Sequence, residues 1–194
     1  MSLKGTRTAN NLMISFAGEA QATFRYNVAA KQAKKEGYVQ IQNIFEETAR
    51  NEVEHGKRFY KFLREDFEPD EAVNVNWDYP VTYSNTVDNL QSAINGEHGE
   101  AHSMYPEFAD IAEEEGFPEI AYVWREIAEV EEAHEIRFRK LLDNIKTGRV
   151  FERDEEVVWK CNNCGYLHTG KSAPDRCPAC DHEQEYFELF VETY

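Results

Sequence analysis

Several features are scarce in this sequence, and each absence excludes a class of protein. No run approaches the ~20 apolar residues of a membrane span, and the start, MSLKGTRTANNLMISF, lacks the apolar core and cleavage site of a signal peptide. Basic residues are outnumbered, 21 to 37, by acidic ones, so the formal net charge is -16. Because such a charge repels polyanions, we expect no nucleic-acid or membrane partner. The sequence predicts a cytoplasmic protein that binds cations.

Proline is absent from the first 68 residues, which have helical periodicity. This stretch is interrupted at Glu36-Gly37, where glycine is a natural helix C-cap, so two long helices are expected. Residues 67–85 lose the periodicity and predict a long connection, and further helices are expected over about 86–115 and 118–146. The pattern predicts a mainly α protein, a four-helix bundle with one long crossover.

Cysteine is absent outside residues 161–180. From Trp159 onward the composition changes to cysteine, proline, glycine and aromatic residues. We therefore expect a helical domain over 1–148 and a small second domain over 156–194. The spacing C-x2-C, twelve residues, C-x2-C is typical of tetrahedral thiolate ligation by Cys161, Cys164, Cys177 and Cys180. Spacing alone makes zinc the commoner ion and leaves iron open, and a disulfide is the weakest alternative in the cytosol.

The two predicted helix pairs look like an internal duplication. A shift of 79 residues aligns Glu36-Gly37 with Glu115-Gly116, Phe45 with Trp124, Glu52 with Glu131, and His55 with His134. Gly18-Glu19 aligns with Gly96-Glu97 at a shift of 78, so one residue was gained or lost in between. The repeat predicts a pseudo-twofold axis in the bundle.

Carboxylates interrupt the apolar face of every predicted helix. In the last helix, Glu131 and His134 lie on the apolar stripe, whereas Glu126, Glu129, Glu132 and Glu135 fall off it. The second helix places Glu52 and His55 in the same way, the first contributes Glu19, and the third contributes Glu97 and Glu100. Each residue alone is more typical of a solvated Glu or a hydrogen-bonded core His. Five glutamates that face one another, however, require cations, because like charges in a dry core are costly.

Two metal ions would neutralise such a core. One Glu from each of two helices, plus a Glu-x-x-His from each of the other two, is the ligand set of di-iron and di-manganese bundles. Oxygen and imidazole ligands favour iron or manganese, although zinc stays open. Glu100 has Ala22 as its counterpart in the repeat, so the two metal positions are expected to differ. Tyr26 and Tyr105 either pack in the core or orient a ligating carboxylate through the hydroxyl.

Five segments in this order resemble the rubrerythrin family nearly end to end: FAGEAQATFRYN, NEVEH, NGEHGEAHSMYPEF, EVEEAH and WKCNNCGY...CPAC. The resemblance implies a ferritin-like four-helix bundle followed by a small rubredoxin-like, metal-bound β domain. It implies two iron ions in a carboxylate-bridged site and one iron held by four cysteines. It also implies a peroxidase that reduces hydrogen peroxide to water with electrons from a donor redox protein, and so protects the cell against oxidative stress.

The resemblance also implies roles for individual residues. Glu52 and Glu131 would bridge the irons, Glu19 would bind one iron, and Glu97 with His134 would bind the other. Glu100 and His55 would be the catalytic pair, binding the first iron alternately in its oxidised and reduced states.

The resemblance also implies an antiparallel homodimer. His134 lies about a dozen residues, or roughly 18 Å, before the end of its helix, so electron delivery between subunits would shorten the path. The alternatives are an oxygen-reducing ferroxidase or oxidase, a non-catalytic iron-storage protein, and structural zinc in the cysteine module.

Overall fold

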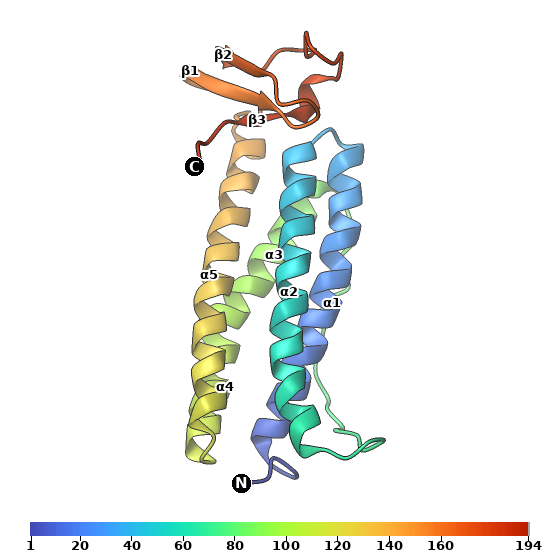
Figure 1. The fold of residues 1–194 in the computed structure, drawn as a ribbon, viewed down its shortest axis with the longest axis vertical. Coiled ribbons are helices and arrows are strands. Elements are labelled where there is room, and N and C mark those ends of the chain that lie inside the picture. Colours follow the sequence, from blue (N-terminus) through green and yellow to red (C-terminus); the bar gives the residue numbers. More distant parts are fainter. Residues whose placement is uncertain (194) are drawn as a thin grey trace.

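The protein consists of an elongated helical bundle with a small sheet across one end (Figure 1), as a computed structural model describes for residues 1–193. The bundle contains α1 (Arg7–Lys35), α2 (Val39–Asp66), α3 (Thr86–Gly99), α4 (Tyr105–Glu114) and α5 (Pro118–Lys146). A π-helix, Glu100–Met104, joins α3 to α4, so together they form the third long helix of the bundle. The expected mainly α fold with one long crossover is confirmed. No helix in the described range is long and apolar enough to cross a membrane.

The two halves of the bundle are held together by the same contact made twice. Glu115, at the end of α4, accepts hydrogen bonds at Oε2 from the backbone N–H and the hydroxyl of Thr8 at the start of α1, at 2.8 and 2.6 Å. Glu36, at the end of α1, accepts from the backbone N–H of Thr86 at the start of α3, at 2.9 Å. Each glutamate precedes a glycine with positive φ that ends the helix. The repeat in the sequence therefore corresponds to a repeat in the contacts.

Aromatic side chains form two related clusters along the bundle. Phe59 packs against Tyr105 and Trp124, with ring centroids 5.6 and 5.8 Å away. Its counterpart, Phe138, packs against Tyr26 and Phe45 at 5.5 and 5.1 Å. The side chains of all six aromatic residues are almost fully buried. The two clusters belong to two separate apolar cores, and each core supplies one wall of the polar layer described below.

The π-helix explains why the repeat changes its offset. Glu19 pairs with Glu97 at a shift of 78, whereas Tyr26 pairs with Tyr105 at a shift of 79. The additional residue must lie between Glu97 and Tyr105, and the π-helix occupies this interval. A π turn accommodates one inserted residue without ending the helix. The expected third helix over 86–115 is thus continuous in direction but not regular in its hydrogen bonding.

The second part of the chain is a three-stranded antiparallel sheet in the order β2-β1-β3. Its strands are β1 (Glu152–Cys161), β2 (Leu167–Ser172) and β3 (Phe187–Leu189), and Trp159 and Phe187 are buried in its small core. It lies at the end of the bundle where α5 finishes and α1 turns into α2 (Figure 1). The expected small metal-site β domain is confirmed, and the domain limits 1–148 and 156–194 stay a prediction.

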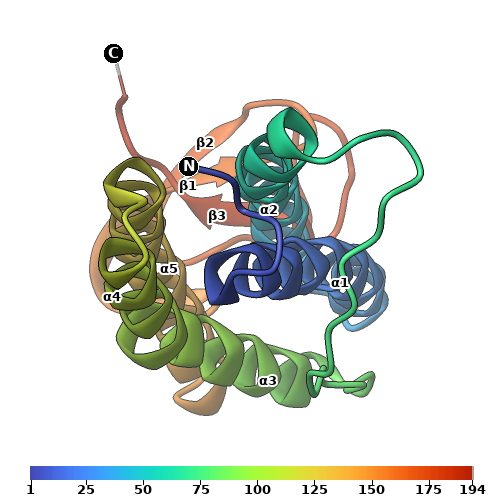
Figure 2. The same ribbon diagram turned by 90° about the horizontal axis from the view of Figure 1, so that it is seen from below.

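The crossover, residues 67–85, connects the two helix pairs. Figure 2 shows it leaving the end of α2 and passing α1 before α3 begins. Tyr79 attaches it to α1 by donating a hydrogen bond from its hydroxyl to the carbonyl of Ile14 at 3.1 Å. This segment, which the periodicity could describe only as a connection, therefore covers one seam of the bundle.

Deleting Glu100 should convert the π turn into a regular α-helix and leave the fold intact. Deleting its counterpart Ala22 should rotate the rest of α1 by about 100°, because one residue is removed from a regular helix. That rotation turns Tyr26, Ala29, Ala30 and Ala33 out of the core. We expect the thermal midpoint, measured by circular dichroism, to change by a few degrees for the first deletion and to fall by more than about 10 °C for the second. An equal fall in the thermal midpoint for both deletions would contradict the interpretation that the π turn accommodates one inserted residue.

Candidate dinuclear metal centre and four-cysteine site

Two groups of possible metal ligands meet in the middle of the bundle. The first contains Glu19 of α1, Glu52 and His55 of α2, and Glu131 of α5, and the second contains Glu52, Glu97 of α3, Glu131 and His134. Within each group the ligand atoms lie within 4.8 Å of one another. Because Glu52 and Glu131 belong to both groups, the arrangement has two neighbouring positions for ions with two shared carboxylates.

The distances within the two groups repeat the twofold relation. Nδ1 of His55 lies 2.9 Å from carboxylate oxygens of both Glu52 and Glu131, and 3.9 Å from Glu19. Nδ1 of His134 lies 2.9 Å from Glu131, 3.3 Å from Glu52 and 3.8 Å from Glu97. The two rings are 6.0 Å apart. The sequence therefore placed each Glu-x-x-His pair correctly on the inner face of its helix.

Several of these atoms are buried without a hydrogen bond. Both carboxylate oxygens of Glu52, one of Glu131 and Nδ1 of His55 have no partner in hydrogen-bonding geometry. Buried polar atoms are normally satisfied, because an unmet group costs about 1–3 kcal/mol. Oxygens and an imidazole nitrogen that converge without bonding are instead the donor set that iron or manganese accepts. The residues present thus fit a carboxylate-bridged pair of such ions.

The charges in this layer are strongly perturbed. Burial, followed by repulsion from Glu131 and Glu52, raises the pKa of Glu19 well above its usual range. Burial likewise raises the pKa of Glu97 to about 8. Burial would also raise the pKa of Glu131, but the facing rings of His134 and His55 lower it to about 2. The two imidazoles are the only cations in the ligand groups, and the carboxylates raise the pKa of His55 to about 10 against the effect of burial.

Two tyrosines connect the layer across the bundle. Tyr105 of α4 donates its hydroxyl hydrogen bond to Oε1 of Glu19 on α1 at 2.5 Å. Tyr26 of α1 donates to Oε1 of Glu97 on α3. Each tyrosine therefore contacts the carboxylate of the opposite half, not the one on its own helix. Both hydroxyls are buried, and they fix the orientation of the two carboxylates that belong to only one ligand group.

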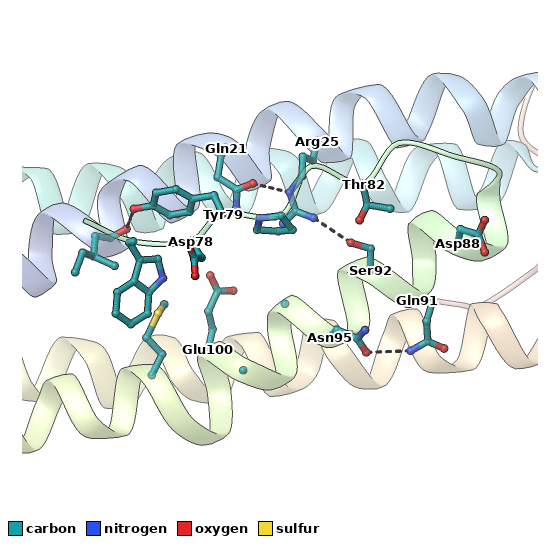
Figure 3. A pocket seen from close by; sticks show the side chains of 17 residues that line it. Gln21, Arg25, Asp78, Tyr79, Thr82, Asp88, Gln91, Ser92, Asn95 and Glu100 are labelled. Atoms are coloured by element: carbon teal, nitrogen blue, oxygen red, sulfur yellow. Dashed lines mark hydrogen bonds between the residues drawn. The ribbon is translucent and has the colours of Figure 1, made fainter. Parts of the chain in front are cut away.

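Glu100 lies outside both ligand groups. Its carboxylate is directed into a cavity of about 690 Å³ between α1, α3 and the crossover (Figure 3). Three glycines, Gly18, Gly96 and Gly99, are among the residues that line this space. Burial and the charge of Glu97 raise the pKa of Glu100 well above its usual range. The first ligand group thus contains His55 and not Glu100 in this structure, and the exchange between them stays a prediction.

The four cysteines converge at the second site. Sγ of Cys161 lies 3.8 Å from that of Cys180, and Sγ of Cys164 lies 3.6 Å from that of Cys177. These distances exclude a disulfide, whose sulfurs are ~2.05 Å apart, and all four cysteines are free. They are close to the edge of a tetrahedron around an ion with metal–sulfur bonds of ~2.3 Å. The backbone N–H of His182 lowers the pKa of Cys180 to about 6, which favours the thiolate.

Comparison with known proteins supports both sites. The family model named Rubrerythrin matches residues 10–142, and a second model, the rubredoxin-like domain of rubrerythrin, matches residues 159–188. This chain belongs to the rubrerythrin family. The rubrerythrin of Clostridium perfringens is 58% identical over 194 residues, covering 100% of this chain and 99% of that protein. The rubrerythrin of Nitratidesulfovibrio vulgaris is 50% identical over 189 residues, covering 97% and 96%.

Solved structures agree with the family assignment. Nigerythrin in a partially reduced state superposes with a TM-score of 0.64 at 30% identity, covering 97% of this chain and 92% of that one. The bacterioferritin of Desulfovibrio desulfuricans superposes with a TM-score of 0.65 at 20% identity, which shows a shared ferritin-like fold alone. The rubrerythrin family has a di-iron site and a four-cysteine iron site, and this chain carries candidate ligands for both.

The periodicity missed some of the residues around the rubrerythrin site. Glu135 was expected off the buried stripe, yet it is only 6% exposed, because side chains of α3, the π-helix and α5 surround it. Arg25 and Tyr79 line the cavity beside Glu100 and had no recognisable pattern. Only contacts between distant segments reveal these positions.

The free energy of unfolding of the metal-free protein should fall as the pH rises from about 5 to 9. An unfolded Glu97 ionises near its ordinary value of 4.5, whereas the folded side chain keeps its proton up to about 8. Folding therefore takes up a proton in this window, and stability decreases with pH. The contribution of His55 has the same sign, since it is complete below 6.5 and lost as the pH approaches 10.

Urea unfolding of chelator-treated protein at several pH values measures this dependence. The ionisation of Glu131 makes the free energy of unfolding rise with pH, but only below pH 4.5, because the folded pKa of this group is about 2. The matched variant Glu97→Gln, which cannot ionise, should show a shallower decline. Stability that rises steadily up to pH 9 would contradict the charge balance described above.

Proposed function

We propose that this protein is a cytoplasmic peroxidase that reduces hydrogen peroxide to two molecules of water. The observation that carries the proposal is the combination of two ion positions sharing Glu52 and Glu131 with a separate four-cysteine site in one chain. When bound, two iron ions supply the two electrons that cleave the O–O bond, and the iron of the four cysteines resupplies them from a donor redox protein. The reaction also consumes two protons.

The geometry and the family support a role for each ligand. Glu52 and Glu131 would bridge the ions, since each belongs to both groups. Glu19 and His55 would complete the first position, and Glu97 and His134 the second. The hydroxyls of Tyr105 and Tyr26 hold the carboxylates of Glu19 and Glu97 in place. These hydrogen bonds would keep Glu19 and Glu97 oriented toward the ions, whereas the exchange of His55 for Glu100 would change the ligands at the first position.

Glu100 is the residue best placed to supply protons. It occupies the cavity wall next to the ligand layer, and burial raises the pKa of its carboxyl, which favours the protonated form. A protonated carboxyl can donate to a leaving oxygen and then recover a proton from solvent through the cavity. The π turn puts this carboxyl in the second half only, where the first half has Ala22. The substrate would therefore be expected on the side of the layer that Glu100 lines.

Peroxide should reoxidise the reduced, iron-loaded protein much faster than oxygen does. The test is stopped-flow mixing of anaerobically reduced, metal-assayed protein with equimolar hydrogen peroxide or with air-saturated buffer, following the visible band of the thiolate-bound iron. Glu131→Ala or His134→Ala should abolish the fast phase, because each removes a ligand from the layer. If oxygen is as fast as peroxide, the protein is an oxidase. A protein without the visible band would hold another ion in the cysteine site.

We further propose that electrons pass between the subunits of an antiparallel homodimer. His134 lies twelve residues before Lys146, the last residue of α5, or roughly 18 Å along the helix. The sheet begins only beyond that end. A second subunit in the opposite orientation would bring its cysteine site beside this bundle.

Mixed dimers test this path directly. Cys161→Ser removes the electron entry of one subunit, and His134→Ala removes the peroxide site of the other. Each variant alone should be inactive with the donor protein, and hybrids formed by mixing should regain peroxide reduction. Cys161→Ser alone should still turn over with a small artificial donor that reaches the bundle. Inactive hybrids, or a solution mass that matches a monomer, would contradict transfer between subunits.

A further inference from the structure

A third cluster of possible metal ligands lies on the outside of the bundle. It consists of His98 in the last turn of α3, His102 in the π-helix and Glu135 in α5. None of these residues belongs to the two inner ligand groups. His98 follows Glu97 and Glu135 follows His134, so the cluster occupies the outer side of the same helical turns. Ligand atoms of the three residues lie within 4.8 Å of one another.

The two imidazoles converge on one carboxylate oxygen. Nδ1 of His98 lies 3.1 Å and Nε2 of His102 lies 3.3 Å from Oε2 of Glu135. The ring centroids are 4.6 Å apart. The spacing of four residues brings both rings to one face of the helix. Three donor atoms thus surround a point that is open to water, since the side chains of His98 and His102 are 56% and 42% exposed.

The carboxylate of Glu135 is held ready for this arrangement. Its side chain is only 7% exposed, and Nε of Arg139 donates to Oε1 at 2.6 Å. This contact occupies one oxygen and leaves Oε2 facing the two rings. The guanidinium of Arg139 also supplies the positive charge that a buried carboxylate needs as a partner. An outer partner that orients a ligating carboxylate is a regular feature of metal sites.

A purely structural role for the carboxylate and the two imidazoles explains these contacts less well than metal binding does. Arg139 already neutralises Glu135, so the fold does not need two further rings there. Both rings are also partly exposed to water, so neither belongs to a buried core. The chain also carries a net charge of -16, which concentrates cations at its surface.

We propose that His98, His102 and Glu135 bind one divalent transition-metal ion at the surface. Two imidazoles and one carboxylate are the ligands of open zinc sites, in which water completes the coordination. The same donor set accepts ferrous, cobalt, nickel and cupric ions and discriminates against calcium and magnesium. The site is separate from the proposed peroxidase reaction, because none of its three residues is a ligand of the inner ions. It would raise the number of metal ions from three to four in each chain.

Zinc binding to the iron-loaded protein tests the proposal. Protein with iron in the inner and cysteine sites is dialysed to equilibrium against increasing zinc, and zinc and iron are both measured by mass spectrometry. We expect one zinc per chain to bind without loss of iron. The double variant His98→Ala/His102→Ala should weaken this binding by at least ~10-fold, the lower limit seen even when an outer partner of a ligand is lost.

Two further variants make the result specific. His168→Ala, on β2 and outside every ligand cluster, should bind zinc as the unchanged protein does. Glu135→Gln retains the shape of the side chain but removes its charge, and it should weaken binding as the double variant does. Thermal melts check that each variant is folded. Equal zinc binding by the unchanged protein and the double variant, or zinc uptake matched by loss of iron in both, would overturn the proposal.

Discussion

The neutralisation of buried carboxylates is the constraint on which the rest of this structure depends. Glu19, Glu52, Glu97 and Glu131 are each at most 1% exposed, and they meet in one layer of the bundle. Without compensation this layer would be strongly unfavourable, because charge in a dry interior costs several kcal/mol per ion. In the metal-free protein His55 and His134 offset part of the charge as imidazolium cations, and two metal ions would take over this role, because a ligating imidazole is neutral. The unbonded oxygens of Glu52 and Glu131 show where these ions are needed.

The surrounding fold makes this layer rigid in a symmetric way. The aromatic clusters around Phe59 and Phe138 lie on either side of it, and the tyrosine of each cluster bonds to a carboxylate of the opposite half. The layer is therefore attached to both cores at once. The two halves are thus connected by hydrogen bonds as well as by packing. This arrangement explains why a duplicated helix pair can build a single site.

One inserted residue breaks the symmetry where the chemistry would need it. The π turn begins at Glu100, where the first half has Ala22, and the carboxyl of Glu100 points into the cavity beneath the crossover. The first half has Ala22 at this position, so only one face of the ligand layer has an additional carboxyl group. The same turn carries His102 to the outer surface beside His98. A single irregularity in a helix thus shapes both an inner and an outer group of polar residues.

The sequence by itself determined the helices, the repeat and the residues of both candidate sites. Helical periodicity identifies the inner face of one helix, so Glu52, His55, Glu131 and His134 could be placed together, and the spacing of the cysteines has one common structural solution. Tertiary structure alone decided which helix each tyrosine contacts, that Glu135 is buried, that His55 and not Glu100 joins the first ligand group, and that the crossover covers Glu100. These features depend on contacts between residues far apart in the chain. Periodicity cannot encode them, because it reports only how one helix is oriented and not which neighbour it meets.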